Sequence, residues 1–170
     1  MFWIKLIKKL FKALNSEASP GSIGGGVILG MVVGLTPLFT LTNILIISLI
    51  IVIKVNVSAA IFSSLMFGII GYFIDPVAHN LGETALTANS LENLWSALYN
   101  IPVIPFTLFN NTVVMGTLII SFILMVPVFW GVKKLVVEYR KDFQKKVVKL
   151  KIVKLIKASK IYKIYRRVKV

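Results

Sequence analysis

The stretch SPGSIGGGVILGMVVGLTPL, residues 19–38, decides the fold class of this chain. It opens with a serine–proline pair suited to starting a helix, carries no charged side chain, and reaches a second proline at Pro37. Gly26, Gly30 and Gly34 recur every fourth residue, so they share one helix face on which another helix can approach closely. An uncharged apolar helix with such a face is typical of helix packing inside a membrane.

Three further apolar segments follow, at about 38–54, at about 57–74, and from about 111 past Trp130. A helix that crosses a bilayer needs roughly 20 residues, so the first two of the four segments are short. They are either thin, tilted crossings or a re-entrant hairpin. The prediction is an all-α integral membrane protein of about four apolar helical segments, with amphipathic interfacial helices beside them.

The segment at 57–74 supplies the expected partner of the glycine face. Ala60, Ser64 and Gly68 lie every fourth residue along it and form a second row of small side chains. We expect the two rows to pack together within one protomer. Packing of the glycine row against a second subunit, in a homo-oligomer, is the alternative.

The distribution of charge supports a membrane location. The chain has 170 residues, is 57% hydrophobic and has a formal net charge of +14. Residues 13–132 hold one basic residue, Lys54, whereas residues 133–170 hold fifteen and residues 1–12 hold four. A charge at the bilayer centre costs at least about 2.5–3.5 kcal/mol, whereas a basic residue beside anionic lipid gains about 1 kcal/mol. Basic residues therefore mark the cytoplasmic side, which predicts that both termini lie there.

This orientation predicts three parts of the chain: an amphipathic interfacial helix at 1–15, a membrane domain at 20–132, and a basic cytoplasmic tail at 133–170. Region 75–110 has no Lys or Arg and is expected outside, on the far side of the membrane. Four crossings leave Lys54 cytoplasmic, and so do two crossings with a re-entrant hairpin. Charge alone leaves both topologies open.

The lysines near the two ends are predicted to contact lipid headgroups. A secretory signal peptide would need an unbroken apolar run, which the lysines near the N-terminus interrupt. The basic tail follows a membrane segment directly and alternates with apolar residues, which favours lipid over nucleic acid or a cytoplasmic protein. The predicted headgroup contacts are Lys5, Lys8, Lys9, Lys12, Lys133 and Lys134.

Within region 75–110, two helix starts are predicted. Asp75-Pro76 suits the cap and first residue of a short helix, and Asn89 with Glu92 three residues later suits another. Asp75, His79 and Glu83 also follow each other at four-residue spacing. That spacing allows a proton or metal site at the outer surface, whereas capping and interfacial polarity are the plainer interpretation.

Asn43, Asn110 and Asn111 are amides at or near membrane depth. Such groups must find hydrogen-bond partners, either between helices or in a transporter site. The chain has no cysteine, and we find no nucleophile–base or metal motif in it. We therefore expect no enzymatic activity, no metal and no cofactor.

Several blocks resemble one known family. The run at 19–38, the asparagines at 43 and 56, Asp75-Pro76, and HNLG at 79–82 resemble a small bacterial inner-membrane family catalogued as a domain of unknown function. WSALYN at 95–100 and FNNTVVMG at 109–116 are similar to a narrower subgroup of it. The resemblance covers about residues 8–132. It implies a bacterial inner-membrane protein, often paired with a large AsmA-like periplasmic protein.

Two functional hypotheses follow. The first is a non-enzymatic, multi-pass subunit of the inner membrane that anchors a large periplasmic lipid-transfer partner and supplies phospholipid to it. The second is a small oligomeric transporter or channel built on the hairpin and Asn43.

Overall fold

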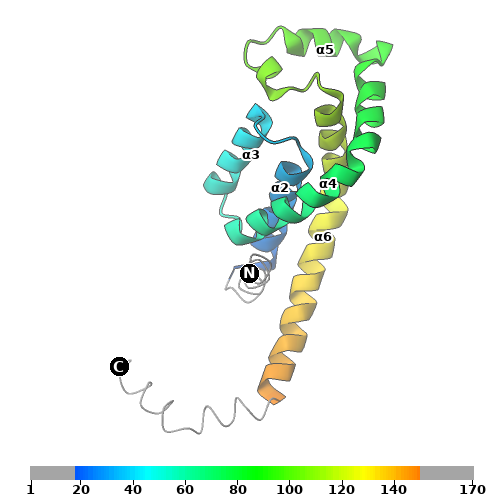
Figure 1. Cartoon of the computed structure of the whole chain (residues 1–170). Coiled ribbons are helices and arrows are strands. Elements are labelled where there is room, and N and C mark those ends of the chain that lie inside the picture. The colour runs from blue at the N-terminus through cyan, green and yellow to red at the C-terminus, as the bar shows by residue number, and fades with distance from the viewer. Residues whose placement is uncertain (1–17, 150–170) are drawn as a thin grey trace. The chain divides into compact units, whose positions relative to one another are not determined.

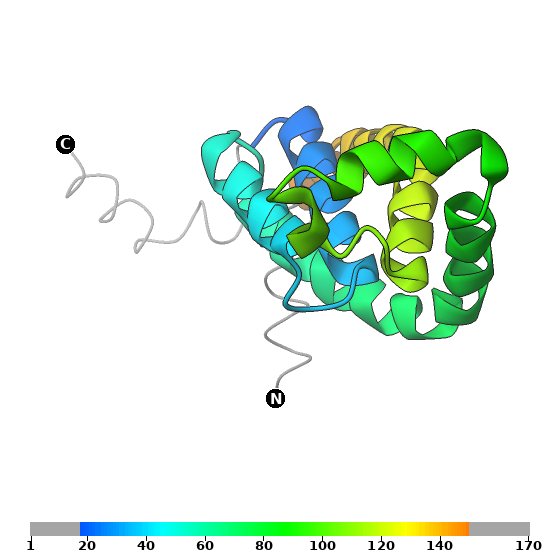
Figure 2. The same ribbon diagram turned by 90° about the horizontal axis from the view of Figure 1, so that it is seen from above.

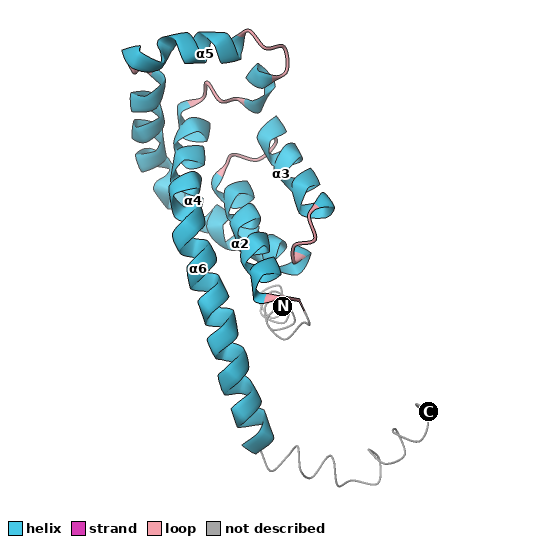
Figure 3. Ribbon diagram, turned by 180° about the vertical axis from the view of Figure 1, so that it is seen from behind, coloured by secondary structure: helices cyan, strands magenta, loops and turns pink. Residues whose placement is uncertain are grey.

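The computed structural model describes residues 18–149, and all regular structure in that range is helical, as the sequence predicts (Figures 1 and 3). Helices α4 and α6 are long and apolar enough to cross a membrane, whereas α2 and α3 are shorter apolar helices. The elements in chain order are α2 (Pro20–Leu35), α3 (Leu41–Val52), α4 (Val57–Leu86), η1 (Asn89–Leu91), α5 (Glu92–Tyr99), η2 (Ile104–Thr107) and α6 (Thr112–Lys149).

The chain divides into two compact units, Met1–Lys134 and Leu135–Val170. The features described below belong to the first unit. The second contains the C-terminal part of α6, which continues as a helix to Lys149. The interfacial helix predicted at 1–15 and the basic tail after residue 149 lie outside the described residues.

Short polar side chains start the first three helices. Ser19 caps α2 by accepting a hydrogen bond from the Ser22 backbone N–H at 3.0 Å, and Pro20 follows it, which confirms the predicted start. Thr40 caps α3, and the Asn56 side chain caps α4 by accepting from the Ala59 N–H at 2.9 Å. Each cap satisfies backbone donors that a helix end leaves free.

Helix α2 packs along the first half of α4, and the glycine row lies at the contact (Figure 1). A Cβ atom on Gly30 would collide with the backbone carbonyl of Ala60, and one on Gly34 would collide with the Ser64 carbonyl and the Gly68 nitrogen. The structure thus brings together the two small-residue rows within one chain. The Ser63 hydroxyl donates to the Val27 carbonyl at 2.6 Å and adds a polar link between the helices.

A second close crossing joins α4 to α6, and the sequence analysis missed it. A Cβ atom on Gly82 would collide with the Thr112 carbonyl, and one on Gly116 would collide with the Ala78 carbonyl. Ala78 is fully buried there. The row Ala78–Gly82 resembles the other small-residue rows in spacing, but it lies after Pro76, where a helix break was expected.

The predicted helix start at Asp75-Pro76 is wrong, because α4 runs through it to Leu86. Pro76 has no N–H to donate to the carbonyl four residues earlier, which removes one helical hydrogen bond and bends a helix without having to end it. Figure 2 shows α4 bending along its course. Gly71 and Ala78 are buried on either side of the proline, and this packing holds both halves in one helix.

Region 87–111 contacts the C-terminal end of α4 and the start of α3. The Trp95 indole N–H donates to the Ala85 carbonyl at 3.0 Å, and the Trp95 ring lies 6.3 Å from that of Phe109. The Thr42 hydroxyl donates to the Thr107 carbonyl at 3.1 Å and ties η2 to the start of α3. A helical start is observed near the predicted place, since η1 begins at Asn89 and α5 begins at Glu92, but the predicted capping by Asn89 is wrong because neither helix has a side-chain cap.

Large apolar side chains cover the outside of the described region, and many buried side chains are small or polar. The exposed face of α3 alone presents Ile44, Leu45, Ile47, Leu49, Ile51 and Val52. Buried polar residues among those described are Thr36, Thr40, Asn43, Ser63, Thr117 and Ser121. This is the reverse of the usual distribution in water, where charged and polar residues cover the surface.

Candidate functional site

Two ends of the first unit can be told apart by their contacts. At one end the Ser22 hydroxyl donates to the Lys54 carbonyl at 3.1 Å, and the Asn56 N–H donates to the Ser22 carbonyl at 3.0 Å. Gly24 lies at this same end against α6, since a Cβ there would approach the Phe129 ring at 2.9 Å. This end therefore joins the start of α2, the α3–α4 loop and the part of α6 near Phe129.

The opposite end joins the α2–α3 turn, region 87–111 and the start of α6. Gly82 meets Thr112 there, as described above. From Thr112 to Phe129, α6 rises roughly 26 Å, close to the ~30 Å thickness of a bilayer's hydrocarbon core. The two ends are thus separated by about one membrane thickness of apolar helix.

The charged residues of the described part of the first unit are divided between these two ends. The basic residues lie at the first end, called the basic end below, and the acidic residues lie toward the opposite end, called the acidic end. The basic residues are Lys54, Lys133 and Lys134, and the acidic ones are Asp75, Glu83 and Glu92. The Lys133 ammonium lies 5.0 Å from the centroid of the exposed Trp130 ring, one turn beyond Phe129. Lys5, Lys8, Lys9 and Lys12 lie outside the described residues.

The turn between α2 and α3 is closed by Asn43, which is buried with 4% of its surface exposed. Its side-chain N–H donates to the Pro37 carbonyl at 3.0 Å, and its Oδ1 lies 2.5 Å from the Thr36 hydroxyl. Asn43, predicted above as an amide at membrane depth, therefore has a structural role in this turn. Phe39 lies in the same turn with a φ of 65° and 98% of its surface exposed, and no pattern in the sequence indicated this conformation. A positive φ is unusual for such a bulky residue.

A groove lies between this turn and α4. Its volume is about 440 Å³, and α4 forms one wall while the end of α2 and the turn form the other. Of the eleven described residues that line it, Asp75 is the one with a charge. The lining residues are Gly34, Leu35, Thr36, Pro37, Leu38, Leu65, Gly68, Ile69, Gly71, Tyr72 and Asp75.

The predicted Asp75–His79–Glu83 row is divided in two. His79 Nε2 lies 3.8 Å from the Glu83 carboxylate, and His79 Nδ1 lies 2.6 Å from the Thr112 hydroxyl at the start of α6. Asp75 instead belongs to the groove. Within the described residues, no three His, Asp or Glu side chains gather in a way that could hold a metal ion.

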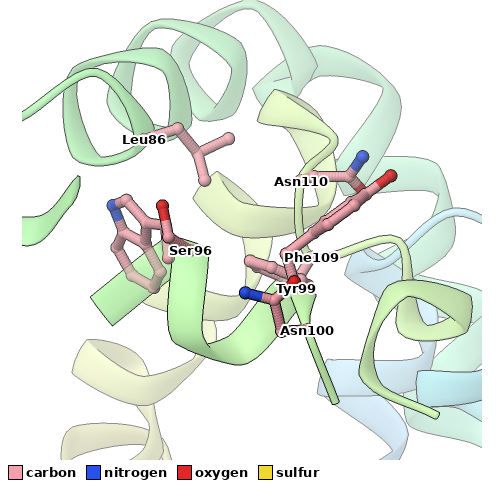
Figure 4. Close-up of a pocket in the computed structure, with 7 residues that line it drawn as sticks. Leu86, Ser96, Tyr99, Asn100, Phe109 and Asn110 are labelled. Carbon is pink, nitrogen blue, oxygen red and sulfur yellow. The ribbon is translucent and has the colours of Figure 1, made fainter. Parts of the chain in front are cut away.

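The two predicted asparagines at the start of α6 also have different positions. Asn111 caps α6, since its Oδ1 accepts from the Val113 and Val114 N–H groups at 3.0 and 3.2 Å. Asn110 lines a second pocket of about 440 Å³ between α5 and the chain leading into α6 (Figure 4). Leu86, Trp95, Ser96, Tyr99, Asn100 and Phe109 complete its lining, and the sequence analysis did not foresee this pocket.

Comparison with known proteins identifies the family. Residues 5–145 match a family described as "Uncharacterized protein conserved in bacteria (DUF2062)". The chain belongs to this family. A protein of Treponema pallidum (strain Nichols), described as "Uncharacterized protein", is 26% identical over 137 residues, which are 81% of this chain and 85% of the relative. No solved structure matches the chain.

Proposed function

We propose that this protein is a multi-pass, non-enzymatic subunit of the bacterial inner membrane that anchors a large periplasmic lipid-transfer partner and supplies phospholipid to it. The observation that carries the membrane part is the apolar exterior between a basic end and an acidic end. A bilayer stabilises this exterior, whereas water would not, and the basic end matches the cytoplasmic side. Exposed Trp130 at one end and exposed Tyr72 beside Asp75 fit the aromatic residues found at both membrane interfaces.

The α2–α3 hairpin supports a role in handling lipid. At 16 and 12 residues, the two helices measure roughly 24 and 18 Å, less than the ~30 Å hydrocarbon core. Local thinning of the bilayer is one way in which a membrane accommodates helices this short. Thinning beside the exposed Leu38 and Phe39 would ease the removal of a lipid molecule from the outer leaflet of this membrane.

Region 87–111 supports a partner on the same side. It holds exposed apolar side chains at Ile101, Val103, Phe106 and Leu108, and the exposed carboxylate of Glu92 belongs to the same region. Apolar residues rimmed by polar ones are typical of protein interaction surfaces. The resemblance of this chain to proteins often paired with an AsmA-like periplasmic protein names the kind of partner.

The transporter or channel hypothesis is weaker than this one. It depends on Asn43 as a polar group available to a solute, but the turn already engages the Asn43 side chain at Thr36 and Pro37. One result would support the transporter hypothesis: solute flux through the protein reconstituted in proteoliposomes, abolished by Asn43→Leu.

Co-purification tests the proposed function. The affinity-tagged chain, extracted from its host membrane in mild detergent, should bring down phospholipid and a large periplasmic protein. Phe106→Ser should reduce recovery of that protein by about tenfold or more, because truncating a central apolar contact typically costs about 2 kcal/mol of binding. Phe122→Ser is the matched control, since Phe122 is similarly exposed but lies on α6, outside region 87–111. A lipid-poor chain without a partner would contradict the proposal.

A further inference from the structure

We propose that the groove between the α2–α3 turn and α4 binds one phospholipid with a primary-amine headgroup, of the phosphatidylethanolamine class, whose ammonium group donates hydrogen bonds to the Asp75 carboxylate. The inference rests on the proposed function and deepens it, because it names the lipid that the protein would supply. The acyl chain lies along α4, and the headgroup lies at the acidic end.

The dimensions of the groove match one lipid leaflet. Its α4 wall extends from Leu65 to Asp75, which is roughly 15 Å of helix and about half of a ~30 Å hydrocarbon core. Leu65, Ile69 and Tyr72 line this wall and remain exposed, so the groove is accessible from the surrounding lipid. Leu35, Thr36, Pro37 and Leu38 form the opposite wall, at the end of α2 and in the turn that follows it.

The charge of the groove selects the headgroup. An ammonium group offers three N–H donors. Its hydrogen bonds to a carboxylate are stronger than hydrogen bonds between neutral groups, because both partners are charged. The sequence from residue 55 to residue 132 contains no Lys or Arg, so nothing in that range would neutralise an anionic headgroup beside Asp75. A headgroup with net negative charge in the groove would meet the Asp75 carboxylate and be repelled by it.

Asp75 is available for such a contact. The nearby histidine, His79, directs Nε2 toward Glu83 and Nδ1 toward Thr112, and not toward Asp75. A half-buried carboxylate among apolar residues at the lipid interface can take a cationic headgroup as its hydrogen-bond partner. Asp75 lines the groove, carries a negative charge and has no Lys or Arg within residues 55–132. These three properties indicate a ligand with a cationic group.

A competition experiment tests the proposal. The full-length chain is exchanged into mixed micelles holding equal amounts of phosphatidylethanolamine and phosphatidylglycerol, and the bound lipid is quantified by mass spectrometry. We expect phosphatidylethanolamine to be enriched about fivefold over phosphatidylglycerol, equivalent to about 1 kcal/mol. Asp75→Asn should bring the ratio back close to that of the input, because it removes the charge and keeps the shape. Glu83→Gln, the matched control, removes a charge outside the groove and should leave the enrichment intact.

Each outcome decides the proposal. No preference for phosphatidylethanolamine in the unmodified chain overturns it, whether or not the variants fold. Equal enrichment in the chain and in Asp75→Asn also overturns it, provided that both unfold at the same temperature. Recovery of a periplasmic partner and of unselected phospholipid would leave the proposed function intact while rejecting the assignment of the headgroup, so the two failures are distinguishable.

Discussion

Single glycines set how closely the helices approach. At Gly26, Gly30 and Gly34 the space that a Cβ would need is filled by the α4 backbone, and the same holds at Gly82 and Gly116 for the crossing of α4 with α6. Backbone atoms cannot rotate away as a side chain can, so the contact tolerates no added carbon. Such packing matters most in a bilayer, where the hydrophobic effect does little to hold helices together.

Gly30→Leu is therefore expected to destabilise the fold by at least about 2 kcal/mol, in the range found for overpacked cores. Thermal unfolding of the detergent-solubilised chain is the measurement. Gly131→Leu makes the same chemical change at a glycine with nothing within 4 Å of its missing side chain, and it should leave the midpoint nearly unchanged. Equal midpoints for the two variants would mean that the α2–α4 contact does not limit stability.

At the scale of elements, the α2–α3 hairpin depends on one amide, and α4 depends on packing on both sides of its proline. Asn43 joins the end of α2 to the start of α3 through Thr36, Pro37 and its own cap at Thr40. Because the turn has few apolar contacts and an exposed tip, these polar contacts fix its shape. They work best where water cannot compete for them.

Asn43→Leu should loosen the hairpin. The change leaves the Pro37 carbonyl and the Thr36 hydroxyl without this partner, at a cost of about 1–3 kcal/mol. Amide hydrogen exchange across residues 36–43 should accelerate, while exchange in α6 stays the same. Ser48→Ala is the control on the same helix, since the Ser48 hydroxyl donates to the Ile44 carbonyl within α3 itself at 2.8 Å. Unchanged amide exchange in Asn43→Leu would show that the Asn43 side chain does not stabilise the hairpin.

For the whole molecule, the central question is how many times the chain crosses the bilayer. The first unit has a basic end and an acidic end about one bilayer core apart, and the α2–α3 turn is tied to the acidic end through Thr42 and Thr107. On the membrane location proposed above, we predict four crossings and not a re-entrant hairpin. With four crossings, the α2–α3 turn faces the same compartment as region 87–111.

Cysteine labelling tests this topology cleanly, because the native chain has no cysteine. With a membrane-impermeant maleimide applied to spheroplasts, Leu38→Cys and Ser90→Cys should both react from outside. Lys54→Cys should react only after permeabilisation, since it lies at the basic end. Labelling of Leu38→Cys solely from the cytoplasmic side would instead establish the re-entrant hairpin.

The sequence by itself determined the helical class and the approximate starts of the apolar segments, and it favoured the pairing of the small-residue rows on α2 and α4 within one chain. Each of these depends on local composition, periodicity or capping, which the chain carries wherever it lies. Only the tertiary structure decided that α4 continues past Pro76, that Asp75 separates from His79 and Glu83, and that Gly82 meets Thr112. Those outcomes depend on which helices press against one another, and local composition, periodicity and capping do not specify that choice.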